Sequence, residues 1–424
     1  MKWPEVELGE AVVFGPKTKL QKGQPYAFVG MQDINPIDNF VYSYSDEIFD
    51  GQGGAKFSNG QILFARITPC LENRKIAQVK LGEGGTGFGS TEFFVFDEKE
   101  EVSDINYLLY LLKTDYVINH AIGSMVGASG RQRADWQYFK NIKIPLPPLH
   151  LQRQIAAVLG RYDSLLENYQ VQIATLQALA HEVYREWFVR GRGLGVIVGV
   201  EKELPVGWRK GKLREVLDFY IGGGWGQDEP DDAHTVGGHV VRGTDIPNLK
   251  KGQVNLDVYR YHKASNMASR ELRAGDIVFE VSGGSTDQGL GRNVLITDEA
   301  LAKFGDKVMP ASFCKLIRAD QVKISPYYLQ QLLDHLLETQ EMAQFEVQST
   351  GISNFQFEDF IDYQPVIIPA MEAMNRFDKL VGPMYKKIGI LSTQMATLRA
   401  TRDALLPRLL SGQLAVEALE TAEI

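Results

Sequence analysis

Residues 149–189 read LHLQRQIAAVLGRYDSLLENYQVQIATLQALAHEVYREWFV, and apolar side chains recur along them at helical spacing. The steps between these side chains alternate between three and four residues, with one extra four-residue step after Tyr169. This alternation is typical of a coiled-coil seam, and the extra step is a stutter. The seam positions are Leu151, Ile155, Val158, Tyr162, Leu165, Tyr169, Ile173, Leu176, Ala180, Val183 and Trp187.

A second seam lies near the end of the sequence. Its positions are Met374, Phe377, Val381, Met384, Ile388, Leu391, Met395, Leu398, Leu405 and Leu409. The alternation is unbroken if Arg402 takes the position between Leu398 and Leu405. Pro383 is predicted either to kink this helix or to mark its true start, because proline removes a backbone donor and clashes with the preceding turn.

Each seam predicts a helix roughly 55–60 Å long at about 1.5 Å per residue. Gly191, Gly193 and Gly195 are expected to end the first helix, and Gly412 the second. The matched lengths favour an antiparallel pair within the chain. Pairing with another chain, or an ordinary buried helix face, stays open as an alternative.

The rest of the chain is an internal repeat. Sequence that begins at Trp3 returns at Trp208, and the motif of residues 60–64 returns at residues 275–279. The offset grows from 205 residues at Trp3 and Trp208 to 222 at Ala174 and Ala396, and it never reverses. Two related units, the second with loop insertions, produce this pattern.

Local patterns predict mixed α/β structure in each unit. In the first, residues 62–67 and 92–96 resemble short strands, and residues 105–122 are apolar at helical spacing. The predicted fold is therefore α+β: two mixed α/β units in pseudo-two-fold repeat, separated by two long helices that form an antiparallel coiled coil. The predicted boundaries are 1–148 for the first unit, 149–191 for its helix, 192–204 for a linker, 205–369 for the second unit, 370–412 for its helix and 413–424 for an acidic tail.

The charge balance restricts how the chain could bind a nucleic acid. The formal net charge is −8. Residues 1–148 carry 15 basic against 18 acidic side chains, and residues 201–369 carry 18 against 25. A protein that binds DNA by phosphate charge alone is usually basic. Any DNA-binding face must therefore be a local patch, or a partner must supply positive charge.

Few sequence features suggest a membrane, a metal or a disulfide. Cys70 and Cys314 occupy non-equivalent repeat positions, so neither a disulfide framework nor a zinc site is indicated. The seven histidines are scattered. The first residues lead into no apolar signal segment, and the apolar stretch 194–200 is too short to cross a bilayer. We expect a cytoplasmic protein without membrane contact.

Catalytic motifs are not found in the sequence. It contains no Gly-x-x-x-x-Gly-Lys-Ser/Thr phosphate loop, no His-Glu-x-x-His and no Asn-Pro-Pro-aromatic motif of adenine methylation. Residues 97–99 resemble only the last element of a nuclease active-site motif. The glycine-rich segments 222–226 and 283–284 lack nucleotide-binding spacing. We therefore expect no catalysis, and an enzyme that uses the glycine loops remains an alternative.

The endings of the two repeats resemble the specificity (S) subunits of type I restriction–modification enzymes. The segment 127–133 reads GASGRQR, and it is followed by Phe139 and by the proline-rich residues 144–149. Residues 349–354 with Phe360 form a weaker second version. The unit openings and the ending at residues 405–412 also resemble this family, so the similarity covers nearly the whole chain in order.

Three departures from the family pattern affect helix geometry. His150 stands where a glutamate usually follows the prolines, the second proline cluster shrinks to Pro369, and Pro383 interrupts the second helix.

The resemblance implies a complex in which different subunits have different functions. Each unit would be a target-recognition domain that reads one half of a split double-stranded DNA sequence, and the two helices would fix the spacer. Two methyltransferase (M) subunits would dock on the chain, and restriction (R) subunits would join them. S-adenosylmethionine, ATP and Mg are expected on these partners, with no cofactor and no active site in this chain.

Candidate DNA-binding residues are donor side chains near the central strands and in the junction loops, because base and phosphate contacts need such donors. In the first unit they are Arg66, Arg74, Lys75, Ser129, Arg131, Gln132 and Arg133. In the second they are Ser282, Ser285, Gln288, Arg292, Asn293, Ser349, Thr350, Ser353 and Asn354. The alternative for each is an ordinary polar loop residue.

Two further functions compete with this reading. A coiled-coil adaptor that binds only proteins would suit the acidic charge. A relative fused to a modification enzyme would need methyltransferase motifs, and the sequence has none.

Overall fold

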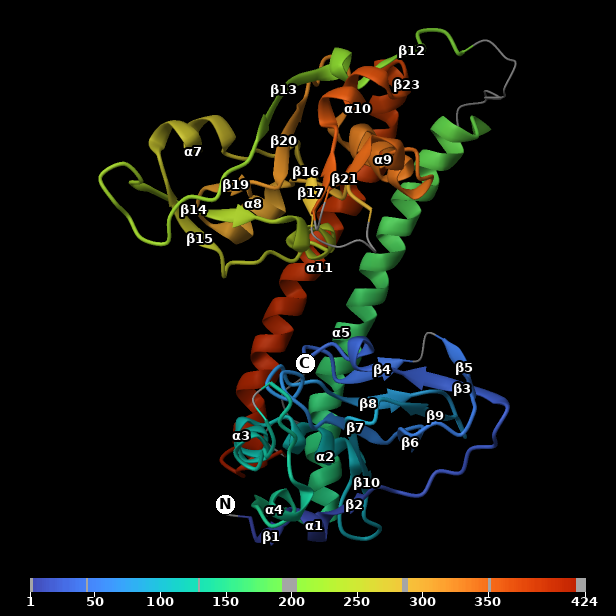
Figure 1. Ribbon diagram of the computed structural model, residues 1–424, viewed down its shortest axis with the longest axis vertical. Coiled ribbons are helices and arrows are strands. Elements are labelled where there is room, and N and C mark those ends of the chain that lie inside the picture. Colours follow the sequence, from blue (N-terminus) through green and yellow to red (C-terminus); the bar gives the residue numbers. More distant parts are fainter. Residues whose placement is uncertain are drawn as a thin grey trace. The chain divides into compact units, whose positions relative to one another are not determined.

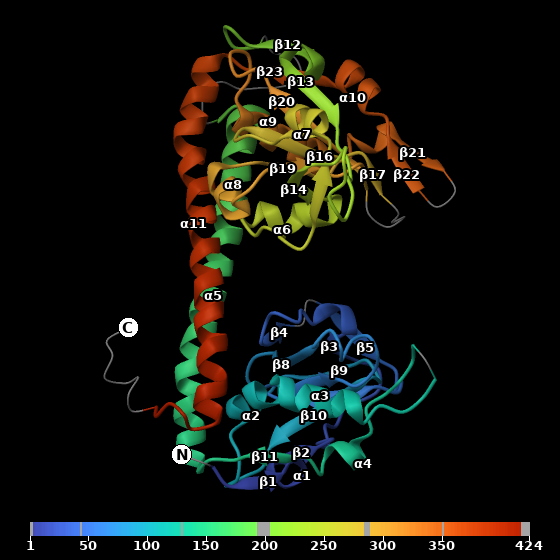
Figure 2. The same cartoon turned by 90° about the vertical axis from the view of Figure 1, so that its left-hand side faces the viewer.

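The computed structural model describes residues 3–42, 45–128, 130–192, 204–283, 289–349 and 352–416. The backbone contacts divide into two compact units (Figures 1 and 2). Unit 1 consists of Met1–Glu167 with Leu398–Ile424, and unit 2 consists of Asn168–Thr397. The long helices α5 (Leu149–Tyr184) and α11 (Met371–Leu410) each contribute residues to both units.

Unit 1 is built on a five-stranded sheet. Its order is β2 (Val12–Phe14), β10 (Phe93–Glu98), β7 (Ile62–Ala65), β8 (Ile76–Lys80) and β4 (Phe40–Tyr42). The first four strands are antiparallel to their neighbours, and β4 joins β8 in parallel. β7 is buried on both faces, which explains its uninterrupted apolar sequence.

A second sheet of unit 1 packs against the first. Its order is β5 (Asp46–Phe49), β3 (Gln24–Val29), β9 (Thr86–Gly89) and β6 (Ala55–Ser58), with β3 and β9 parallel. One buried cluster combines Phe57 of this sheet with Leu63 of β7, while Phe64 points into the cluster on the other face. This alternation follows from the two-residue period of a strand.

Helices cover the other face of the five-stranded sheet. The predicted single helix over residues 105–122 is wrong, because the chain forms α2 (Ile105–Leu112) and α3 (Asp115–Gly123). The break follows from capping: the Thr114 hydroxyl accepts a hydrogen bond from the Val117 amide and starts a new helix. The unit also contains α1 (Leu8–Ala11), η1 (Met31–Asp33), α4 (Trp136–Phe139) and the ladder of β1 (Glu5–Glu7) with β11 (Lys143–Pro145).

Unit 2 has an antiparallel central sheet. Its order is β13 (Leu217–Gly222), β20 (Cys314–Ala319), β16 (Asp276–Glu280) and β18 (Asn293–Leu295). The helix α9 (Pro326–Glu338) packs on this sheet through Leu329 and Leu333, which share a buried cluster with Ile277.

Three smaller ladders complete the strands of unit 2. The first contains β15 (Tyr259–His262), β14 (Val236–Val241) and β19 (Val308–Pro310), in that order. The second contains β17 (Ser282–Gly283), β22 (Ile352–Phe355) and β21 (Glu346–Ser349). The third pairs β12 (Arg209–Lys212) with β23 (Pro365–Ile368). Its short helices are η4 (Leu213–Val216), η5 (Gly243–Asp245), α6 (Ile246–Lys250), α7 (Ala264–Arg270), α8 (Asp298–Phe304), η6 (Ala343–Phe345) and α10 (Phe357–Tyr363).

Most predicted seam positions are buried or half-buried on the described helices, but Leu165 is exposed and its neighbour Leu166 is buried instead. α5 continues as the π-helical turn η2 (Arg185–Val189) and ends before Gly191, while Gly193 and Gly195 lie outside the described residues. α11 begins at Met371, so the alternative that Pro383 starts the second helix is wrong. The buried guanidinium of Arg402 forms an ion pair with Asp163 of α5 at 2.6 Å.

Candidate nucleic-acid interface

In unit 1, two predicted arginines meet at one carboxylate. Nε of Arg133 lies 2.9 Å from Oε2 of Glu92, and Nη2 lies 2.7 Å from Oε1. Arg66, just beyond β7, approaches the same carboxylate at 3.2 Å. Hydrogen bonds from Arg133 and Arg66 hold the pKa of Glu92 below its usual value. The charged state of Glu92 therefore anchors the junction loop to the sheet.

Backbone hydrogen bonds reinforce this anchor. The amide of Thr68 donates to the carbonyl of Gln132 at 3.0 Å, and the amide of Gln132 donates to the Thr68 hydroxyl at 3.1 Å. Arg131 is exposed and makes no ion pair with any residue that the structure describes. Its guanidinium is therefore available to a ligand outside the chain. Ser129 lies outside the described residues.

Arg74 and Lys75 have other partners. Arg74 forms an ion pair with Asp115 at 2.5 Å, and its φ of 56° places it in the left-handed region. Lys75 donates to the backbone carbonyl of Met31 at 2.7 Å. Neither side chain joins the group around Glu92, so the first set of predicted residues divides into two separate groups.

In unit 2, a similar acid–arginine pair lies beside the central sheet. Nε and Nη2 of Arg292 donate to the two oxygens of Glu280 at 2.7 and 2.6 Å. The Glu280 side chain is 5% exposed, and the hydrogen bonds raise the pKa of Arg292. Both residues line a cavity of about 600 Å³ together with Trp225 and Phe313.

Three other predicted residues of unit 2 meet at the ladder of β17 with β22. The Ser282 hydroxyl lies 3.2 Å from the carbonyl of Ser353 and 2.9 Å from Oδ1 of Asn354. Ser282 and Ser353 are buried, whereas Asn354 is exposed. The remaining members of the set cannot be placed: Ser285, Gln288 and Thr350 lie outside the described residues, and Ser349 is described only by its backbone at the end of β21.

Asn293 does not belong to this interface. Its side chain is 0% exposed, donates to the carbonyl of Gly291 at 3.0 Å and accepts from Gln330 at 2.6 Å. A base contact requires an accessible amide. The prediction of a DNA contact at Asn293 is therefore withdrawn, because the core uses the amide to satisfy its own polar groups.

Comparison with known proteins shows what the chain resembles. The family model of the type I restriction modification DNA specificity domain matches residues 2–177. The MjaIX type I restriction enzyme specificity subunit of Methanocaldococcus jannaschii is 27% identical over 333 residues, which cover 74% of this chain and 70% of that subunit. The chain therefore resembles the specificity subunits of type I restriction enzymes.

Two further similar proteins differ in how much of this chain they cover. The EcoEI specificity subunit of Escherichia coli is 29% identical over 178 residues, which is 41% of this chain and 30% of that subunit. The crystal structure of the type I restriction-modification system S subunit from M. genitalium aligns with 96% of each chain at 14% identity and a TM-score of 0.54. At this identity the likeness shows a shared fold.

The described helices of the chain include none that is both long and apolar enough to cross a bilayer. Sequence reasoning missed the acids that organise both groups, Glu92 and Glu280. A signal existed, because each acid adjoins an apolar strand and a charge in such a place needs a partner. It also missed Arg260, whose guanidinium lies 4.5 Å from the Trp225 ring centroid.

Proposed function

We propose that this chain is the non-catalytic DNA-specificity subunit of a type I restriction–modification complex. Each unit reads one half of a bipartite double-stranded DNA target. The two long helices set the spacing between the halves and carry the docking sites for two methyltransferase subunits, with restriction subunits joining the complex. The observation that carries this proposal is the matching order of elements in the two units.

The strand order supports two related recognition domains. In unit 1 the strands β2, β10, β7 and β8 are neighbours in that order, and in unit 2 the strands β13, β20, β16 and β18 follow the same chain order. β3 pairs with β9 in parallel, as β14 pairs with β19. The ladders β1–β11 and β12–β23 join the beginning of each unit to its end, and a long helix follows each ladder.

The contacts of the long helices support an antiparallel coiled coil. In unit 2, the rings of Trp187 and Phe377 lie 6.2 Å apart, and a pocket nearby is lined by Gln177 and Tyr385. From the first pair to the second, the residue number falls from 187 to 177 in one helical segment and rises from 377 to 385 in α11. This is the order expected of two helices that run in opposite directions. Because two such helices are rigid along their length, they suit the role of a spacer.

The two acid–arginine groups support DNA reading by loops held on a rigid scaffold. Glu92 holds the loop that carries Arg131 in unit 1, and in unit 2 the pairing of β22 with β17 holds Asn354. Arginine reads guanine and asparagine reads adenine through paired hydrogen bonds. Arg66, Arg133 and Arg292 share their charge with a carboxylate, and we therefore assign them to loop positioning.

The acidic balance supports a dependence on partners. At a net charge of −8, the chain alone carries too little positive charge to hold a DNA duplex strongly. We infer that the methyltransferase subunits supply phosphate contacts, S-adenosylmethionine and adenine methylation, while ATP and Mg act on the restriction subunits.

Mapping of adenine methylation tests this function directly. The cognate methyltransferase subunit is expressed in a methylation-free host with this chain, without it, and with a chain that lacks unit 2. A split, asymmetric methylated sequence is expected only with the full chain. Methylation that is equally specific without this chain would overturn the proposal and favour the protein-binding adaptor.

A further inference from the structure

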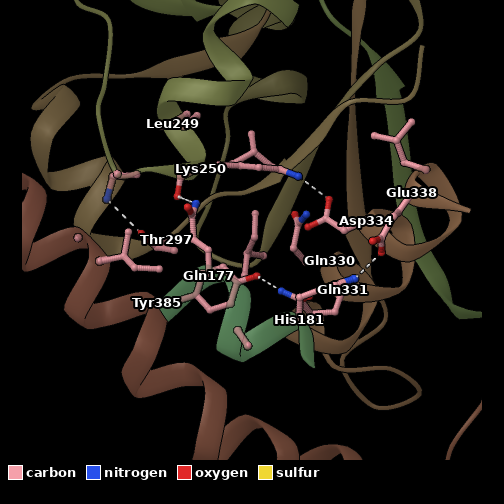
Figure 3. Close-up of a pocket in the computed structure, with 18 residues that line it drawn as sticks. Gln177, His181, Leu249, Lys250, Thr297, Gln330, Gln331, Asp334, Glu338 and Tyr385 are labelled. Carbon is pink, nitrogen blue, oxygen red and sulfur yellow. Dashed lines mark hydrogen bonds and ion pairs between the residues drawn. The ribbon is translucent and has the colours of Figure 1, made fainter. Parts of the chain in front are cut away.

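Three potential metal ligands converge where α5 meets α9 in unit 2. His181 comes from α5, whereas His335 and Glu338 are one turn apart on α9. One ligand atom from each lies within 4.8 Å of the other two. Figure 3 shows His181 and Glu338 facing one another at the edge of a pocket of about 420 Å³. Residues of this pocket are not among the candidate DNA contacts.

The hydrogen bonds around His181 leave a lone pair aimed at a carboxylate. Nδ1 of His181 lies 2.9 Å from Oε1 of Gln331, and Gln331 donates through Nε2 to the Tyr385 hydroxyl at 2.8 Å. With the amide held this way, Nδ1 of His181 carries the proton. In the neutral ring, Nε2 then presents a lone pair to Oε2 of Glu338 at 2.8 Å. Two acceptors at this distance need a shared proton or a shared metal ion.

His335 has the properties of a third ligand. Its Nδ1 is buried and has no hydrogen-bond partner among the described residues. A neutral imidazole carries one nitrogen lone pair, which is what a metal ion binds. An unpaired buried nitrogen costs free energy, and a metal–nitrogen bond would offset that cost.

We propose that His181, His335 and Glu338 form a zinc site that fastens α5 to α9. Two imidazoles and a carboxylate are a donor set that zinc accepts, with a fourth position left for water. Zinc ligands at about 2.0–2.2 Å from the ion lie about 3.3–3.5 Å from one another. The 2.8 Å between His181 and Glu338 would have to widen slightly, and separations of up to 4.8 Å would have to contract. The Glu338 side chain can make this adjustment because it is 55% exposed.

The residues behind the ligands are arranged to orient them. Gln331 fixes the ring of His181 from the far side of the ring, as outer-shell partners of metal-bound histidines do. Nη1 of Arg185 lies 3.8 Å from Oε1 of Glu338, which leaves Oε2 directed at His181. Glu341 adds negative charge near His335, whereas Arg185 opposes it. The site would hold the recognition unit and the helix as one rigid element.

The competing explanation is a protonated His181 in a simple ion pair with Glu338. That ion pair needs no metal, and His335 would have no part in it. The two explanations differ in their response to zinc, so metal binding decides between them without reference to DNA.

The experiment uses the full-length, tag-free chain after removal of metal by a chelator. Zinc affinity is measured by competition with a colorimetric chelator at pH 7.5, and cobalt(II) is added separately as a spectroscopic probe. We expect one zinc ion per chain, a higher unfolding temperature with zinc, and the visible absorption of tetrahedral cobalt. Affinity should fall at pH 5.5, because protonation of the histidines competes with the metal.

Three variants locate the ion. His335→Gln and Glu338→Gln should weaken zinc binding by at least about 100-fold, since even outer-shell partners are worth about 10- to 100-fold. The control is His120→Gln in α3 of unit 1, which should bind zinc as the wild type does. Glu338→Gln preserves the size and a hydrogen-bonding group of an exposed side chain, so its apo form should melt like the wild type. Absence of stoichiometric zinc binding, or unchanged affinity in both site variants, would overturn the proposal.

Discussion

Asp163 is a buried acidic residue of α5. Its carboxylate accepts hydrogen bonds from Asn39 at 2.8 Å, from Arg402 at 2.6 Å and from the Tyr110 hydroxyl. Burial and the neighbouring carboxylate raise the pKa of Tyr110, which therefore stays a neutral donor. A polar pair at a seam position restricts which residues can face one another.

Removal of one partner should destabilise unit 1 strongly. Arg402→Met leaves the Asp163 carboxylate buried without its cation, and the expected loss is about 3–5 kcal/mol. Arg408→Met is the matched control, because Arg408 is exposed on the same helix, and its effect should stay within about 0.5 kcal/mol. Urea unfolding followed by circular dichroism measures both.

A double variant separates lost charge from lost packing. Asp163→Asn combined with Arg402→Met removes the unpaired charge and should recover part of the stability. If the double variant is as unstable as the sum of the single variants, the two side chains do not act as a pair.

At the junction loop, the two arginines should have different roles. Arg131→Ala is expected to lose about 1–3 kcal/mol of discrimination in one half of the target, as for one good base contact. Arg133→Ala releases Glu92 and should weaken recognition of that same half by loosening the loop. Methylation rates on sites mutated in either half provide the measurement.

Arg161, exposed on α5, provides the control. Arg161→Ala should leave both halves unchanged. Equal losses in both halves for Arg131→Ala would contradict the assignment of one loop to one half-site.

At the scale of elements, the proposed function predicts that α5 and α11 set the distance between the two half-sites. The structure changes where this idea is best tested. Insertions between Tyr169 and Ile173 and between Ile388 and Met395 suit the seam, but Ser392 hydrogen-bonds the carbonyl of Gly252 at 2.8 Å. An insertion within the second interval would break contacts of unit 2. Sites after Glu167 and after Thr397, where the two compact units divide the helices, avoid this conflict.

Four residues inserted at both sites should lengthen the DNA spacer. They add about 6 Å of helix at about 1.5 Å per residue. One base pair spans about 3.4 Å, so the spacer should grow by about one to two base pairs. A four-residue insertion also preserves the seam as a stutter. Genome-wide methylation mapping reads the new spacing, and an active complex with the original spacing would show that the helices do not set it.

At the scale of the whole molecule, charge governs when DNA is bound. The chain alone, at −8, should bind duplex DNA no more tightly than about 10⁻⁴–10⁻⁶ M at physiological salt, which is the range of non-specific binding. Affinity and sequence preference should both rise when methyltransferase subunits are added. Fluorescence anisotropy with target and scrambled duplexes measures both. Nanomolar, selective binding by the isolated chain would contradict this view.

The sequence by itself determined the long helices and two strands of the first unit. Seam residues such as Ile155, Ile173 and Met395 are buried as predicted, and Arg402 occupies the seam position assigned to it. β7 and β10 also match the apolar runs that predicted them. These features depend on periodicity over a few residues, which a single sequence contains in full.

Only the tertiary structure decided the roles of individual polar side chains. Glu92 and Arg133 are 41 residues apart in sequence, and His181 and Glu338 are 157 apart. The sequence predicted that Asn293 is a hydrogen-bond donor to DNA, but the fold buries its side chain against Gln330. Pro383 lies within α11, since packing along the helix overrides one lost hydrogen bond. The role of each side chain depends on which residues from distant parts of the sequence it contacts. The local sequence pattern does not contain that information.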